Sequence, residues 1–273
     1  MKYADLHIHS SYSDGCFSPE KIVKLAMEQG LGCISITDHD SLKSQYIAKS
    51  SNSDFKIITG VELSSYLKDT ELHILGYFID PEEAEINNLV NRLQEGRKIR
   101  AEKIINKLRS IDINITLEEV MKVKDGCYGR GSIARVLAEK GYADNHREAF
   151  LNYLDKGKVA YYPGEKADYK EVLRTITNSG GIPILAHPGK INNRMKVENI
   201  IKEMKCFGLK GIEVYHPSHS SKEITTFYNL AVKHKLLITG GSDFHGKEGI
   251  NEILGIQGIS DKLLDKLINF KYR

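Results

Sequence analysis

Histidines and carboxylates recur in short clusters along the chain, and these are the residue types that bind and activate metal ions. His7 and His9 stand two residues apart on a predicted strand, so both side chains point to the same side and one cation can accept both imidazoles. Further clusters follow the other apolar segments. The candidate metal ligands are His7, His9, Asp14, His39, Glu62, His73, His187, Asp243 and His245. Imidazole and carboxylate donors without thiolate suit Mn²⁺, Zn²⁺ or Fe²⁺.

A single histidine at the end of a strand more often makes an ordinary hydrogen bond than binds a metal. Ordinary hydrogen bonding does not readily explain nine such residues at the strand ends, because without a metal they would form a cluster of unsatisfied, mutually repelling groups. Three cations would divide the nine groups into sets of three or four. We therefore predict a site for three divalent metal ions.

The elements that must position these residues are short apolar strands that alternate with helices. Ser18 and Pro19 provide an N-cap and a first helical residue, and the apolar spacing of that helix ends at Gly30. Strands are predicted at residues 3–9, 32–37, 56–63, 72–78, 182–186, 211–215 and 236–239. Seven strand–helix units predict an α/β barrel with parallel strands, one strand short of eight, and an open doubly wound sheet is the alternative. In a parallel barrel the carboxyl ends of all strands share one face, which would bring the clusters together.

The stretch from residue 81 to residue 166 has a different character, with almost no strand pattern. Apolar residues recur at helical spacing between residues 81 and 111, and Thr116 to Glu119 matches a capping box. We predict that residues 1–80 and 167–273 form the metal-binding barrel and that residues 81–166 form an inserted helical lobe. That lobe is either a lid over the barrel mouth or a passive packing unit.

Composition limits the class of protein. The chain has 273 residues, of which 41% are hydrophobic and 27% charged, and a net charge of +3, values typical of a soluble globular protein. It has no apolar run near the roughly 20 residues that a membrane span needs and no signal-peptide core. The cysteines are scattered without metal-binding spacing, as Cys16, Cys33, Cys127 and Cys206. These features predict a cytoplasmic protein with reduced thiols, no membrane association and, at most, a local basic pocket for an anion.

Six motifs resemble those of the PHP (polymerase and histidinol phosphatase) phosphoesterases, in the same order along the whole chain. They are HxHxxxSDG at 7–15, TDHD at 37–40, GVELS at 60–64, HILGY at 73–77, AHPG at 186–189 and GSDFHG at 241–246. The resemblance implies a distorted (β/α)₇ barrel of PHP type with a trinuclear site. It assigns His7, His9, Glu62 and Asp243 to the first metal, with Glu62 bridging to a second. His73 and His187 would hold that second metal, and Asp14, His39 and His245 the third.

Within this family, the helical insert and the string EVYHPSHS at 213–220 are similar to one branch. That branch contains the nucleoside 3′,5′-bisphosphate phosphatases and the 5′-to-3′ trimming ribonuclease RNase AM. The chain differs from this branch in two motifs near the presumed substrate site. Residues 129–132 read Gly-Arg-Gly-Ser where the branch usually shows GRPH, and Lys190 follows Gly189 where an arginine is common.

The expected activity is metal-dependent hydrolysis of phosphate esters, by attack of a metal-bound hydroxide on phosphorus. The expected substrates are small nucleotides, as a 3′-phosphatase of 3′,5′-bisphosphonucleotides, or short RNA 5′ ends, as a 5′-to-3′ exonuclease. His216 and His219 are candidates for protonating the leaving oxygen. Arg130, Arg135, Lys190 and Arg194 are candidates for binding a second phosphate, and Arg130 is also counted as catalytic. No stable protein partner is inferred.

Two other functions remain open from the sequence alone. An amidohydrolase-type enzyme acting on a C–N bond also opens with HxH on its first strand, although it places a Lys or His where this chain has Glu62. A non-catalytic metal-binding module is the third reading, and the complete set of candidate ligands argues against it.

Overall fold

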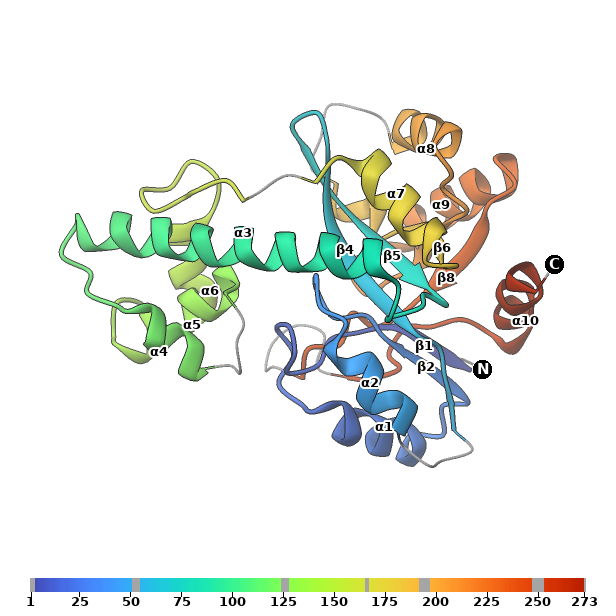
Figure 1. Ribbon diagram of the computed structural model, residues 1–273, viewed down its shortest axis with the longest axis horizontal. Coiled ribbons are helices and arrows are strands. Elements are labelled where there is room, and N and C mark those ends of the chain that lie inside the picture. Colours follow the sequence, from blue (N-terminus) through green and yellow to red (C-terminus); the bar gives the residue numbers. More distant parts are fainter. Residues whose placement is uncertain are drawn as a thin grey trace.

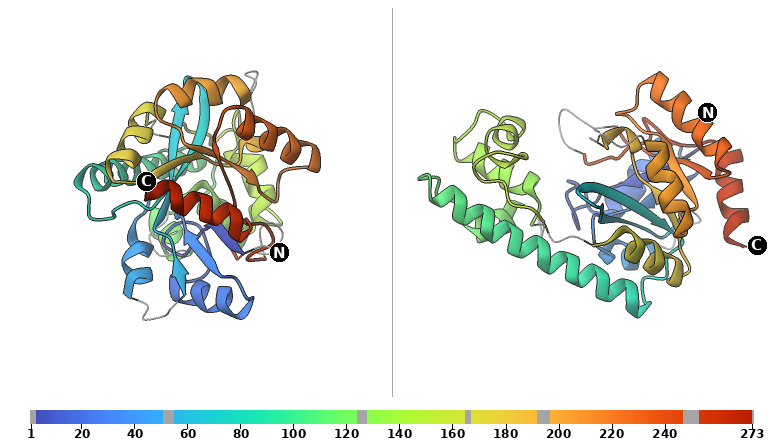
Figure 2. Two further views of the ribbon diagram at one scale, coloured as in Figure 1. Left: turned by 90° about the vertical axis from the view of Figure 1, so that its right-hand side faces the viewer. Right: turned by 90° about the horizontal axis from the view of Figure 1, so that it is seen from above.

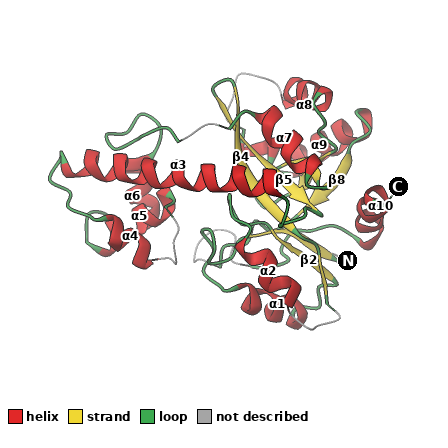
Figure 3. Ribbon diagram, in the orientation of Figure 1, coloured by secondary structure: helices red, strands yellow, loops and turns green. Residues whose placement is uncertain are grey.

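The computed structural model describes residues 3–50, 55–123, 128–164, 167–191, 197–246 and 253–272. The chain has an α/β fold in which the strands gather at one end of the molecule and helices surround them (Figures 1 and 3). The strands are β1 (Ala4–Ile8), β2 (Cys33–Ile36), β3 (Lys56–Ile57), β4 (Gly60–Leu67), β5 (Thr70–Tyr77), β6 (Ile182–Leu185), β7 (Gly211–Tyr215) and β8 (Leu237–Gly240). All are short and rich in β-branched or aliphatic residues, which suits strands buried on both faces.

The strands form two sheets, in the orders β1-β2-β3 and β4-β5-β6-β7-β8. The predicted seven-stranded barrel is not seen as one closed ladder in the described residues. Two isolated parallel bridges lie where the sheets approach each other, between His39 and Glu62 and between Ile8 and Phe244. Both bridges involve segments that carry candidate ligands.

The prediction that all strands run parallel is wrong for β5. It pairs antiparallel with β4 over eight residue pairs and antiparallel with β6 as well. The reason is the connection between β4 and β5, because only Lys68 and Asp69 separate Leu67 from Thr70. A two-residue turn can join only antiparallel neighbours, since a parallel connection needs a crossover of a dozen residues or more.

Within the described residues, six helices pack around the sheets, and α1 begins at its predicted cap. They are α1 (Pro19–Glu28), α2 (Lys43–Ser50), α7 (Tyr169–Asn178), α8 (Val197–Cys206), α9 (Ser221–Lys233) and α10 (Asp261–Lys271). Ser18 accepts a hydrogen bond from the Lys21 amide, and Asp168 accepts one from the Lys170 amide. A capping box that the sequence analysis overlooked opens α9, where Ser220 and Glu223 exchange hydrogen bonds.

A helical lobe stands apart from the sheets and is joined to them by one long helix (Figures 1 and 2). That helix is α3 (Ala84–Arg109). It is followed in the lobe by α4 (Leu117–Val123), α5 (Arg130–Glu139), α6 (His146–Ala149) and the π-helical turn η1 (Phe150–Leu154). The first half of α3 buries Ile86 and Leu93 in the core shared with β4 and β5, and its second half buries Ile104 and Leu108 in the core of the lobe. One helix therefore contributes to two hydrophobic cores and fixes the lobe to the sheets.

No helix within the described ranges combines the length and the apolar composition that crossing a bilayer requires. Cys16, Cys33 and Cys206 are free thiols, and Cys127 lies outside the described residues.

Candidate metal centre

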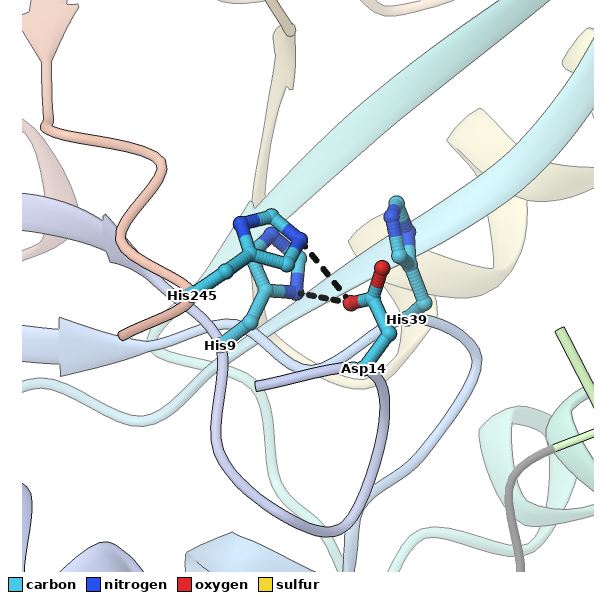
Figure 4. Close-up of side chains that lie close together, drawn as sticks. All are labelled: His9, Asp14, His39 and His245. Atoms are coloured by element: carbon cyan, nitrogen blue, oxygen red, sulfur yellow. Dashed lines mark ion pairs between the residues drawn. The ribbon is translucent and has the colours of Figure 1, made fainter. Parts of the chain in front are cut away.

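The structure brings all nine predicted ligands together at one end of the sheets. Their donor atoms fall into overlapping groups in which every atom lies within 4.8 Å of the others. The groups are His9, Asp14, His39 and His245; His7, His9 and Asp243; His7, Glu62 and His187; and His39, Glu62 and His73. Figure 4 shows the first of these, with Asp14 between the imidazoles of His9 and His245 on one side and His39 on the other. Residues more than 200 positions apart in the chain thus share one site.

Glu62, at the start of β4, is the centre of the cluster and is fully buried. Its Oε2 atom lies 3.2 Å from His7 Nε2, 3.3 Å from His9 Nε2 and 3.0 Å from His39 Nδ1. Its Oε1 atom lies 2.9 Å from His73 Nδ1 and 2.8 Å from His187 Nε2. One carboxylate therefore contacts five imidazoles from four different segments, which is the geometry expected of a bridging ligand.

Two further carboxylates complete the cluster at its other side. Asp243 Oδ1 lies 3.1 Å from His9 Nε2 and 3.5 Å from His7 Nε2. Asp14 Oδ1 lies 2.9 Å from His245 Nε2 and 3.7 Å from His9 Nδ1. His9 therefore stands between the two carboxylates.

Four buried donor atoms of this cluster have no hydrogen-bond partner among the residues that the structure describes. They are His7 Nε2, His9 Nε2, His39 Nδ1 and Glu62 Oε2. A buried polar atom without a hydrogen bond costs about 1–3 kcal/mol, so four of them in one place need a compensating interaction. Nitrogen and carboxylate oxygen donors that face a common point suit a divalent transition-metal ion.

Without a metal, protons on some of the histidines supply part of that positive charge, whereas burial lowers the pKa of His39 and lowers that of His187 to about 3. Burial alone would lower the pKa of His9, but the neighbouring carboxylates of Asp243 and Glu62 raise it to about 9. Burial likewise opposes protonation of His73, yet the charge of Glu62 raises its pKa to about 10. Burial would raise the pKa of Glu62, but the charges of His39 and His7 hold it well below its usual range. The carboxylates thus remain ionised and attract cations.

The backbone at the ends of the strands is held in unusual conformations. Asp40, His187 and Asp243 have φ angles of 48°, 23° and 51°, in the left-handed region that residues with side chains rarely adopt. Such strain costs about 1–3 kcal/mol per residue and persists only where the surroundings enforce it. Two buried carboxylates contribute to that enforcement. Asp38 accepts hydrogen bonds from Ser10 and Ser13 in the loop before Asp14, and Asp5 accepts from both the amide and the hydroxyl of Ser242 beside Asp243.

The two histidines predicted as proton donors differ in what their ring nitrogens contact. His216 accepts a hydrogen bond at Nδ1 from the Ser218 amide, so its proton is on Nε2, which lies 3.2 Å from Asp243 Oδ2. His219 donates from Nδ1 to the Val214 carbonyl and accepts at Nε2 from the Gly189 amide. His219 therefore uses both nitrogens to join two loops, and only His216 directs an N–H toward the metal cluster.

A pocket next to the cluster is lined both by candidate ligands and by arginines. Asp14, His39 and His73 come from the segments around the sheets, Arg97 and Arg100 from α3 and Arg130 from α5, and the carboxylates of Asp40 and Glu71 line the pocket as well. Arg130 was predicted from its motif, stands at the first position of α5 and covers the ring of Phe150 at 5.3 Å. Arg97 and Arg100 were not predicted as site residues. They lie three positions apart on α3, and this spacing places both side chains on the same face of the helix.

Arg97 and Arg100 have different surroundings in this pocket. Arg97 Nε donates to Asp40 Oδ2 at 2.6 Å, which ties α3 to the end of β2. Arg100 Nε is buried and makes no hydrogen bond within the described part of the chain. Burial and the charges of Arg97 and Arg130 lower the pKa of Arg100 to about 10, so it stays charged at neutral pH. A side chain at Gly164 would approach its guanidinium to 2.9 Å, so the glycine keeps space around Arg100.

The remaining predicted phosphate-binding residues are placed differently. Lys190 Nζ lies 2.6 Å from Asp243 Oδ2, at the edge of the metal cluster. Arg135 is directed toward Cys16 Sγ at 3.8 Å and does not line the pocket that contains Arg130. Arg194 lies outside the described residues.

Comparison with known proteins identifies the family. A model of the PHP domain matches residues 5–204. The chain is 33% identical to the 5′-3′ exoribonuclease Rnm of Escherichia coli (strain K12) over 247 residues, 88% of this chain and 84% of the relative. It is 30% identical to the 3′,5′-nucleoside bisphosphate phosphatase of Chromobacterium violaceum, with 90% of this chain and 88% of the relative aligned. A solved structure of a candidate metal-dependent phosphoesterase from Bifidobacterium adolescentis superposes with a TM-score of 0.90 at 28% identity, over 98% of this chain and 96% of the other.

The class of protein is therefore defined by both the fold and the site, which are those of metal-dependent phosphoester hydrolases. The chain belongs to the PHP family, and the resemblance seen in its six motifs is confirmed. The curated relatives named above are phosphoester-cleaving enzymes. A second solved structure, from Chromobacterium violaceum, is described as an amidohydrolase and superposes with a TM-score of 0.87 at 28% identity, over 97% of this chain and 96% of the other.

Proposed function

We propose that the chain hydrolyses a phosphate ester next to a second phosphate, in a nucleoside 3′,5′-bisphosphate or at the 5′ end of a short RNA. The observation that carries this proposal is the pocket lined by two chemically different sets of residues, candidate metal ligands and three arginines. Relatives named as a 5′-3′ exoribonuclease and as a 3′,5′-nucleoside bisphosphate phosphatase act on substrates of these two kinds.

Three divalent cations are the proposed cofactors, with Mn²⁺, Zn²⁺ or Fe²⁺ as the candidates. His7, His9 and Asp243 would hold the first, and Glu62 would bridge it to a second held by His73 and His187. Asp14, His39 and His245 would hold the third. The interatomic distances around Glu62, Asp243 and Asp14 support this division. Bound there, divalent cations polarise phosphate oxygens and lower the pKa of water toward neutrality.

The protein's own groups supply the remaining steps. His216 carries an N–H on Nε2, beside Asp243, and is proposed to donate a hydrogen bond to the leaving oxygen as negative charge develops there. Lys190, also beside Asp243, is placed to neutralise a phosphate oxygen. Arg100 and Arg130 would bind the second phosphate through charge-assisted hydrogen bonds and so fix which ester faces the metals.

We also propose that the two sheets together form the distorted (β/α)₇ barrel of PHP type. The bridges at His39–Glu62 and Ile8–Phe244 support this closure. Residues 1–80 and 167–273 would then form the barrel and residues 81–166 the inserted lobe. The separate hydrophobic core that contains Ile104, Ile133 and Leu137 supports that division.

A substrate panel tests the proposed activity. Protein reconstituted with Mn²⁺, Zn²⁺ or Fe²⁺ would be assayed on p-nitrophenyl phosphate, adenosine 3′,5′-bisphosphate, a 5′-phosphorylated RNA oligomer and a model amide. We expect the highest kcat/KM on one of the two substrates with a second phosphate. Turnover of the amide alone, or equal kcat/KM on p-nitrophenyl phosphate and the bisphosphate, would contradict the proposal.

A further inference from the structure

Glu213 is a charged residue inside the otherwise apolar strand β7, and it is not one of the proposed metal ligands. Its side chain is completely buried. Oε1 lies 2.9 Å from His7 Nδ1, and Oε2 accepts a hydrogen bond of 2.7 Å from the His187 amide. Both carboxylate oxygens of Glu213 thus contact histidines. The Nε2 atoms of these histidines face Glu62, at 3.2 Å for His7 and 2.8 Å for His187. Glu213 therefore lies behind two proposed ligands, on the side away from the metals.

The contact with His7 decides which ring nitrogen carries the proton. Glu213 Oε2 already accepts from the His187 amide, and Oε1 lies within hydrogen-bond distance of His7 Nδ1. A carboxylate oxygen accepts hydrogen bonds, so His7 Nδ1 is the donor. The lone pair of a neutral His7 is consequently on Nε2, which faces Glu62 and Asp243. His216 has the opposite arrangement, because the Ser218 amide donates to its Nδ1 and leaves the proton on Nε2.

The contact with His187 acts on the backbone. His187 follows β6 with φ 23° and ψ 62°, a conformation that costs free energy. Its amide is held by Glu213, and this fixes the turn that directs the imidazole toward Glu62. One carboxylate on β7 thereby orients one histidine on β1 and another after β6.

We propose that Glu213 is a positioning residue that sets the tautomer of His7 and the backbone of His187, so that both present Nε2 to divalent cations. This inference rests on the ligand set proposed above. Carboxylates behind metal-binding histidines commonly change metal affinity by about 10- to 100-fold when they are replaced.

The test compares full-length wild-type protein with Glu213→Gln and Glu213→Ala. A glutamine has nearly the same volume but only one acceptor oxygen, so its NH₂ group must face one of the two N–H donors. We expect the affinity for Zn²⁺, measured by competition with a chelator at fixed pH, to fall about 10- to 100-fold in both variants. A role in packing alone would instead spare the glutamine variant and harm only alanine, which leaves a cavity.

Glu203→Gln is the matched control, because Glu203 also accepts a hydrogen bond, from Tyr169 at 3.0 Å, but contacts none of the proposed ligands. It should bind Zn²⁺ like the wild type. Nitrogen NMR of the zinc-loaded wild type gives a readout that needs no variant, since His7 must carry its proton on Nδ1. A proton elsewhere on His7, or unchanged Zn²⁺ affinity in Glu213→Gln, would overturn this inference alone. Wild-type protein that binds no divalent ion would overturn the proposed ligand set as well.

Discussion

The two walls of the pocket beside the metal cluster are built in opposite ways. On the sheet side, Glu62 contacts five imidazoles, and buried carboxylates such as Asp38 and Asp5 hold the loops that carry the ligands. On the side of the helical lobe, Arg100 Nε makes no hydrogen bond within the described residues and Arg130 rests on an aromatic ring. The first wall is preorganised by the protein, whereas the second leaves hydrogen-bonding capacity that an anionic substrate can use.

This difference indicates a division of labour. Preorganised dipoles and charges act on the reacting bond because they need no rearrangement during the reaction. An unsatisfied guanidinium donor such as Arg100 Nε would act in binding, because a phosphate provides the acceptor that it lacks. Asp40 links the walls, since it lies in the loop after β2, accepts from the Ser64 amide and binds Arg97 of α3. Four predictions test this comparison.

The largest effect is expected on the sheet side. Replacing Asp243 or His39 with Ala should lower kcat by at least about 10³-fold. Each change removes a proposed metal ligand and with it the positive charge that would stabilise the reacting phosphate. Circular dichroism and the thermal midpoint of the metal-free protein should show that the fold is retained. Substantial turnover in either variant, with Glu203→Gln as the active control, would disprove the role of this wall.

Metal affinity should depend strongly on pH. His9 and His73 have pKa values of about 9 and 10 in the metal-free protein, so both carry protons at neutral pH. A histidine binds a metal only through an unprotonated ring nitrogen, and binding therefore releases these protons. The affinity for each ion should rise with pH up to about pH 9, by about 10-fold per unit for each proton that its ligands lose. Chelator competition from pH 6 to pH 9 measures this slope, and a flat profile would contradict the arrangement of charges described above.

A smaller and selective effect is expected on the lobe side. Arg100→Met should raise KM for adenosine 3′,5′-bisphosphate about 10- to 30-fold, which corresponds to about 1.4–2 kcal/mol of lost charge-assisted hydrogen bonding. Turnover of p-nitrophenyl phosphate should stay unchanged because it has no second phosphate. Arg135→Met is the matched control, since Arg135 lies outside this pocket. Equal losses on both substrates would assign Arg100 to the reaction rather than to binding.

The smallest effect on activity is expected from the core of the helical lobe. Leu137 is fully buried there, and Leu137→Ala should cost about 2–5 kcal/mol of stability through lost burial and a cavity. Metal content should be unchanged and kcat on p-nitrophenyl phosphate should remain within about twofold, because none of the proposed ligands lies in the lobe, whose core is separate from the core shared with β4 and β5. Loss of bound metal in this folded variant would show that the two regions are not independent.

The parts of the molecule that local patterns control were predictable. The caps at Ser18 and Thr116 begin helices as expected, because a side chain three residues away satisfies one of the first free amides. The direction of β5 was not predicted, since the alternation of strands and helices was extended across a segment too short to cross over. Arg97 and Arg100 read as ordinary surface residues of a helix until the lobe and the sheet were placed around them.

The sequence by itself determined the set of candidate metal donors, because all nine fall within six motifs that occur in the same order in one family. Only the tertiary structure decided which residues hydrogen-bond to these donors and orient them. Glu213 orients His7 from 206 positions away, and such a partner has no local pattern to identify it. The physical reason is that the tautomer of an imidazole depends on contacts made across the fold, whereas its capacity to bind a metal is a property of the residue itself.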